Sequence, residues 1–252
     1  MRHVMRLTLA AATLLGASAP AAAWADTNAQ APALDVANYT MTAKLDPVAH
    51  TVHGEGTITL KNTTSATLSE VWLHLYLNAF KNQRSAFMRD PVGGFRGSQK
   101  PATWGAIDLR KLTQRTAKGP EDLLPALEKS RPGDDDETDA RVPLREPLEP
   151  GKSLVLDVVW DDTLPSIVER TGFDGTFHFV GQWFPKLAKL EPDGTFAHFP
   201  FHHLAEFYSD FGTYDVTVDV PAGYLVAATG PSVSTKDEGG RHVERHVQAE
   251  VH

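Results

Sequence analysis

Short segments that alternate apolar and polar side chains are the feature that most constrains this fold. Residues 38–47 (NYTMTAKLDP) and 52–62 (VHGEGTITLKN) alternate in this way, with a turn between them. Because successive side chains point to opposite faces of a strand, the two segments predict a β-hairpin. Similar segments follow at 104–112, on both sides of a turn at 149–152, and at 211–221 and 242–252. About a dozen short strands separated by turn residues predict an all-β sandwich or open curved sheet with little helix.

Three other segments predict a fully covered strand and two loops. Residues 71–78 (VWLHLYLN) continue the alternation and predict a strand covered on both faces. Residues 79–105 are rich in Gly, Arg and Ser, which predicts a long surface loop. The acidic run 134–139 (DDDETD) predicts a solvated loop, since it lacks the alternating ligands and central glycine of a calcium loop.

The first 25 residues have the pattern of a secretory signal peptide. They hold two arginines, an apolar run from Leu7 to Ala17 and a closing A-x-A pattern. The apolar run is too short to span a membrane and is followed by Pro20, so we expect an exported protein, periplasmic or secreted, with no membrane span. Residues 26–33 are then the flexible start of the mature chain, and 34–252 the folded domain.

Charge and cysteine content exclude some classes of protein. The formal net charge is −8, and no stripe of Lys and Arg is present, so nucleic acid is not an expected partner. The chain has no cysteine. An exported domain without cysteine has no disulfide framework, and its apolar core must hold it together.

The histidines between positions 198 and 203 raise the question of a zinc site. His198 and His202 have the spacing of the two histidines in H-E-x-x-H, but no Glu follows His198 and Pro200 interrupts the helix that the motif requires. His203 and Glu206 are the other ligands considered. Without a recognised ligand spacing we reject a metal site here and expect these side chains to be structural.

Other catalytic motifs are equally hard to find. The sequence contains no G-x-S-x-G elbow, no cysteine nucleophile and no phosphate-binding glycine loop. Glu206 and Asp210 could form a carboxylate pair for glycoside hydrolysis, but only their proximity in the sequence suggests it.

Gln182 lies among aromatic residues in GQWFP. An amide in apolar surroundings is unfavourable unless its donors and acceptors are satisfied. Gln182 therefore either bonds to the backbone or binds a polar ligand.

Four longer segments, in their order along the chain, resemble the N-terminal region of exported bacterial zinc metallopeptidases of the aminopeptidase N type. The segments are HLYLNAFKNQRSAFMRD, DETDARVPLREPLEPGKSLVL, GFDGTFHFVGQWFPKLAKLEPDG and EFYSDFGTYDVTVDVPAGYLVAATG, and the resemblance covers about residues 35–252. It implies a saddle-shaped, all-β domain that covers the substrate next to a catalytic domain. In that family a glutamine of this domain helps to bind the free α-amino group of peptides, and Gln182 is the matching position.

The resemblance also implies what this chain lacks. The zinc-binding H-E-x-x-H motif of the family belongs to the catalytic domain that follows, and this sequence does not contain it. Zinc is thus implied for a full-length relative, with no cofactor in this chain, which is expected to be inactive alone. The family pattern Gln-x-Glu or Gln-x-Gln is replaced here by Gln182-Trp183-Phe184. The expected partners are peptide N-termini and a metallopeptidase catalytic domain. The alternative is a free-standing β-sandwich module that binds peptides or glycans.

Overall fold

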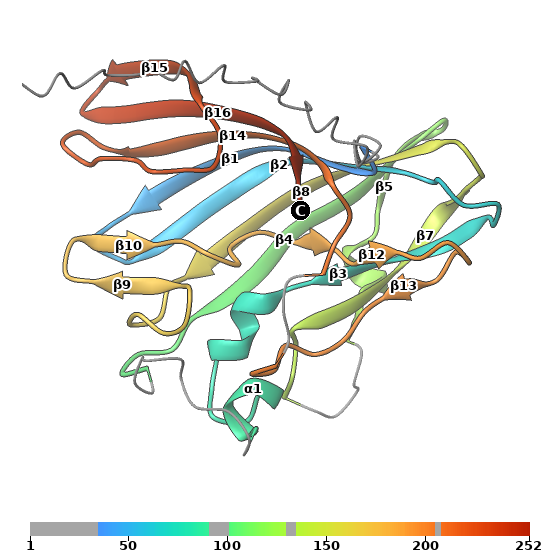
Figure 1. Cartoon of the computed structure of the whole chain (residues 1–252), viewed down its shortest axis with the longest axis horizontal. Helices are drawn as coiled ribbons and strands as arrows, with labels where there is room; N and C mark the ends of the chain where they lie inside the picture. Colours follow the sequence, from blue (N-terminus) through green and yellow to red (C-terminus); the bar gives the residue numbers. More distant parts are fainter. Residues whose placement is uncertain (1–34, 91–100, 130–134, 205–207) are drawn as a thin grey trace, which may run out of the picture. The chain divides into compact units, whose positions relative to one another are not determined.

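The computed structural model describes residues 35–90, 101–129, 135–204 and 208–252, and most of them lie in strands (Figure 1). The larger sheet has eight strands and is antiparallel except where β1 pairs with β14. The predicted hairpin is confirmed as its β1–β2 pair. Across the sheet the strands are β15 (Ser232–Glu238), β16 (Arg241–Val251), β14 (Gly212–Pro221), β1 (Ala37–Asp46), β2 (Thr51–Lys61), β8 (Ser153–Thr163), β4 (Ala106–Thr116) and β5 (Gly119–Asp122).

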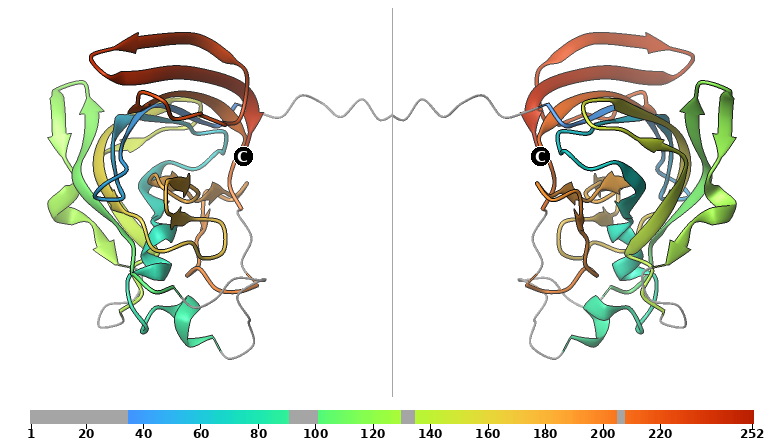
Figure 2. Two further views of the ribbon diagram at one scale, coloured as in Figure 1. Left: turned by 90° about the vertical axis from the view of Figure 1, so that its left-hand side faces the viewer. Right: turned by 90° about the vertical axis from the view of Figure 1, so that its right-hand side faces the viewer.

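A second layer lies against one face of this sheet, and Figure 2 shows the larger sheet bending around it. Among the described residues, helix is confined to the 3₁₀ turns η1 (Tyr76–Phe80) and η2 (Leu124–Ala126) and to α1 (Ala86–Arg89), so the all-β prediction is confirmed. The second layer is the four-stranded sheet β11 (Lys186–Leu187), β3 (Leu68–His74), β7 (Asp139–Leu148) and β6 (Glu128–Lys129), with the short pairs β9 (Gly172–Asp174)–β10 (Phe177–Phe179) and β12 (Lys189–Leu190)–β13 (Phe196–Ala197).

The core lies between the two layers and is built by the alternation seen in the sequence. On β8, every second residue from Leu154 to Trp160 is buried, and Val71 and Leu73 of β3 belong to the same apolar cluster. Gly54 of β2 makes room for the Trp160 indole, since a Cβ there would come within 2.1 Å of the ring. Trp160 is therefore tightly packed against the large sheet, and its indole N–H reaches Trp183 in the segment that follows β10.

The strand predicted at 71–78 and the surface loop predicted at 79–105 are both wrong in part. The strand predicted at 71–78 ends at His74, and Tyr76–Phe80 form the turn η1, in which all five residues are buried. Part of the predicted surface loop is also folded, since it contains the short helix α1. The Ser85 hydroxyl caps this helix by accepting from the Met88 N–H at 3.2 Å. A strand points alternate residues to opposite faces, whereas the turn η1 buries five consecutive residues, the polar Asn78 among them.

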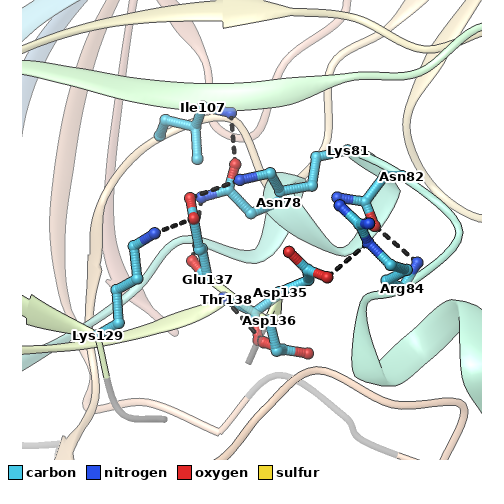
Figure 3. Close-up of polar contacts among 10 residues, drawn as sticks. All are labelled: Asn78, Lys81, Asn82, Arg84, Ile107, Lys129, Asp135, Asp136, Glu137 and Thr138. Carbon is cyan, nitrogen blue, oxygen red and sulfur yellow. Dashed lines mark hydrogen bonds and ion pairs between the residues drawn. The ribbon is translucent and has the colours of Figure 1, made fainter. Parts of the chain in front are cut away.

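The acidic run is a further correction, and Figure 3 shows its contacts. Within the described part of that run, Asp136, Thr138 and Asp139 are buried. Asp136 accepts hydrogen bonds from the backbone N–H groups of Ala86 at 2.7 Å and Thr138 at 3.0 Å, which satisfies its carboxylate away from water. The Asn78 side chain donates to the Glu137 carbonyl at 3.0 Å, so this segment is fastened to η1 rather than solvated.

Asp162 on β8 gives a prediction about stability. It is 1% exposed, its carboxyl oxygens have no hydrogen-bond partner among the described residues, and burial raises its pKa well above the usual value. Between the unfolded and the folded pKa the native state holds a proton that the unfolded chain has lost, so stability falls as pH rises through this window. We expect Asp162→Asn to raise the free energy of unfolding at pH 7 by about 1–3 kcal/mol and to remove this pH dependence. Urea unfolding at pH 4 and pH 7 measures both; an equal change at the two pH values would contradict the assignment.

No helix in the described ranges is long and apolar enough to cross a membrane. The predicted signal peptide (1–25) and flexible mature start (26–33) lie outside the described residues.

Candidate functional site

Gln182 lies between β10 and β11 with its backbone in the left-handed region (φ 58°). This conformation costs a residue with a side chain about 1–2 kcal/mol and persists where the surroundings impose it, often at functional sites. Both neighbours are held by their carbonyl groups: Gly181 accepts from Thr171 Oγ1 at 2.9 Å, and Trp183 accepts from Trp160 Nε1 at 2.7 Å. The Gln182 backbone is thus fixed from both sides.

The Gln182 side chain is unusual in its hydrogen bonding. Its Oε1 atom is buried and has no hydrogen-bond partner in the described part of the chain. Leaving a buried acceptor unsatisfied costs about 1–3 kcal/mol, so such atoms are rare in folded proteins. Gln182 Oε1 therefore does not accept a hydrogen bond from the backbone of any described residue.

Gln182 lines two cavities. The larger, about 100 Å³, is also lined by His74, Tyr76, Phe184 and Lys186. His74 and Lys186 are directly opposite each other in the β3–β11 register, and Tyr76 follows at the start of η1 with its ring stacked on that of His74 at 4.4 Å. The Leu187 N–H donates to the Tyr39 hydroxyl at 3.0 Å, which fixes the short strand β11 to the large sheet.

Burial sets the charges of the larger cavity. It lowers the pKa of Lys186 to about 8, so the ammonium is charged at pH 7. The pKa of His74 falls to about 3 because of burial, with further contributions from Lys186 and His198, so its imidazole is neutral. Burial also raises the pKa of the Tyr76 hydroxyl, which keeps its proton. At neutral pH the described residues that line the cavity comprise one cation, Lys186, and neutral hydrogen-bonding groups.

The smaller cavity is lined by Gln182 together with residues of the turn at 168–171 and of the histidine-rich stretch. Glu169 of that turn has a left-handed backbone (φ 51°), like Gln182. The cavity is lined by Gln182, Glu169, Arg170, Phe87, Phe201, His202 and His203.

The structure separates the histidines that the sequence placed together. The His198 ring stacks on Trp72 at 3.4 Å, and its Nδ1 lies 2.8 Å from Asp139 Oδ2. His203 packs against Phe87, and His202 Nδ1 accepts from the Leu204 N–H at 3.3 Å. Glu206 lies outside the described residues.

Within the described ranges no three His, Asp or Glu side chains are arranged to hold a metal ion. The carboxylate pair of Glu206 and Asp210 stays untested, because Glu206 is not described; Asp210 accepts from the Leu190 N–H at 2.7 Å.

The sequence singles out Gln182 but not His74, Tyr76 and Lys186. His74 and Tyr76 fall within the strand predicted at 71–78, and Lys186 belongs to no motif. The one signal in the sequence is that Lys186 follows an aromatic-rich stretch. Its position beside His74 depends on the β3–β11 register, which the sequence does not show.

No protein-family model matches the sequence, and no curated protein matches it. Among solved structures, the fold is similar to that of the M1 zinc metallopeptidase from Deinococcus radiodurans, at 20% identity and a TM-score of 0.45. A mutant of that protein bound to a Tyr-Ser-Ala substrate matches at 18% identity and a TM-score of 0.47. Each match covers 86% of this chain and 39% of the other, so the chain spans well under half the length of these proteins.

Proposed function

We propose that residues 34–252 form the N-terminal β domain of an aminopeptidase-type metallopeptidase, which covers the substrate and binds its free α-amino group through Gln182. Four segments in the family's order along the sequence support the domain assignment. Residues 1–25 then direct export to the periplasm or beyond. The chain supplies recognition, and cleavage belongs to a catalytic domain.

The buried Gln182 Oε1 atom is the observation that carries the recognition role. A peptide ammonium has three N–H donors and no acceptor, which suits an unsatisfied carbonyl oxygen held by a fixed backbone. The smaller cavity adds a carboxylate from Glu169, although the guanidinium of Arg170 lines it too. Glu169 can thereby replace the second acceptor that the family places two residues after the glutamine, where this chain has Phe184.

Replacing Gln182 with leucine is expected to weaken binding of a free-amino tripeptide such as Ala-Ala-Ala about 10- to 100-fold, because a hydrogen bond to a charged group contributes about 1.5–3 kcal/mol. The N-acetylated tripeptide should bind the unmodified chain weakly and be indifferent to the substitution. Calorimetric titration of both peptides measures this.

Gln248→Leu is the matched control, since Gln248 is a half-buried glutamine on β16 whose amide donates to the Ala249 carbonyl at 3.0 Å. It should leave both affinities unchanged. Equal binding of free and acetylated peptides would reject the amino-group role and favour a free-standing module, for which the exposed rings of Phe177 and Phe179 on β10 offer a surface.

A further inference from the structure

The larger cavity beside Gln182 has features that amino-group recognition does not use. Its volume is about 100 Å³, and Lys186 is the only positively charged side chain among the described residues that line it. Amino-group binding requires an acceptor, whereas this cavity is rich in donors. It therefore suits a different chemical group.

His74 is the most deeply buried of the polar residues that line the larger cavity. It is 1% exposed, and neither ring nitrogen has a hydrogen-bond partner among the described residues. As a neutral imidazole it carries one N–H donor. Because His74 and Lys186 are cross-strand neighbours, their side chains leave the same face of the sheet and reach the same space.

The charge of the surroundings favours an anion. An ammonium would meet the Lys186 ammonium, and an apolar group would leave His74 and Gln182 unsatisfied. A carboxylate can accept from Lys186, from the imidazole N–H of His74 and from the Tyr76 hydroxyl at once, and charge-assisted bonds of this kind are strong. Phe184 supplies an apolar wall for the carbon chain that carries it.

We infer that the cavity lined by His74, Tyr76 and Lys186 binds a carboxylate group, namely the side chain of an amino-terminal Asp or Glu whose α-amino group is bound by Gln182. The second half of this inference rests on the proposed function. Gln182 is shared by both cavities, so one residue can have its ammonium on the Glu169 side and its carboxylate on the Lys186 side. The substrate class is therefore peptides with an acidic first residue.

Several ionisable groups face Lys186 or lie behind it. His74 and Tyr76 stay neutral near pH 7, and the Asp139 carboxylate lies 3.8 Å from His74 Nδ1 while also pairing with His198. Lys186 is thus the group whose titration governs binding. Since its pKa is about 8, affinity for a carboxylate should fall as the pH rises above that value.

The test uses the full chain and four peptides with amidated C-termini: Glu-Ala-Ala, Gln-Ala-Ala, whose first side chain is uncharged, and the N-acetylated form of each. We expect Glu-Ala-Ala to bind at least about tenfold more tightly than Gln-Ala-Ala at pH 7. Lys186→Met should abolish this difference and keep the preference for free over acetylated peptides. Lys189→Met, which changes a partly buried lysine of β12, should keep both.

Equal affinity for the Glu and Gln peptides, or a Glu preference that survives Lys186→Met, would overturn the carboxylate site. If the free-over-acetylated preference remains in that case, the proposed function stands. A Glu preference that is the same on free and acetylated peptides would support the carboxylate site and reject the amino-group role of Gln182.

Discussion

Trp160→Ala is expected to lower the free energy of unfolding by about 3–5 kcal/mol, the largest effect of any single change considered. The side chain is fully buried on β8, between the two layers of the fold. Its ring fills the space over Gly54, so truncation to alanine leaves a cavity that the close-packed surroundings fill only in part. Thermal and urea unfolding measure the loss, and a change below about 1 kcal/mol would show that the indole is not tightly packed.

Trp160→Phe separates the packing of this residue from its hydrogen bond. Phenylalanine keeps much of the apolar volume but cannot donate to the Trp183 carbonyl, which Trp160 Nε1 reaches at 2.7 Å. We expect a smaller loss of about 1–3 kcal/mol. Because Trp183 follows Gln182 directly, this variant should also bind free-amino peptides more weakly. Unchanged peptide affinity would show that the bond does not position Gln182.

Lys186→Met is expected to raise the free energy of unfolding at pH 7 by up to about 3 kcal/mol. Burial lowers the pKa of Lys186 from 10.5 to about 8, and each pKa unit corresponds to about 1.4 kcal/mol between the two protonation states. Below pH 8 the native state bears the full cost of the buried charge. Between pH 8 and 10.5 the unfolded chain binds more protons, so the stability of the unmodified chain rises with pH.

Methionine resembles the aliphatic part of lysine and carries no charge, so the variant should be more stable at pH 7 and show no such rise between pH 8 and pH 10. Denaturant unfolding at pH 7 and pH 10 tests both points, with Lys189→Met as the control for losing a lysine elsewhere. A variant of equal or lower stability with the same pH dependence would contradict the account. A residue that lowers stability while lining a cavity is typical of a binding site.

Much of the β structure follows from the sequence because it obeys one local rule. The β1–β2 hairpin, the strands β7 and β8 on either side of the turn at 149–152, which belong to different sheets, and strands β14 and β16 all have alternating residues and turn signals. The rule fails where burial is continuous, as in Tyr76–Phe80, and where carboxylates accept backbone hydrogen bonds, as in Asp136. Both outcomes depend on tertiary contacts that a local pattern does not contain.

In the candidate site, too, some residues could be predicted from the sequence and others depend on tertiary contacts. Gln182 could be singled out because an amide among aromatics needs an explanation wherever it lies. The pairing of His74 with Lys186 could not be predicted, because it depends on the register of a two-residue strand with a distant segment of the chain. The left-handed backbone of Gln182 likewise lies between two residues, Gly181 and Trp183, whose carbonyl groups accept from the distant Thr171 and Trp160.

A structure of the chain with a bound free-amino tripeptide is the decisive test of amino-group recognition by Gln182. We expect the peptide α-ammonium to lie within hydrogen-bond distance of Gln182 Oε1. A tripeptide lying elsewhere, for example across Phe177 and Phe179 with its ammonium in solvent, would contradict it.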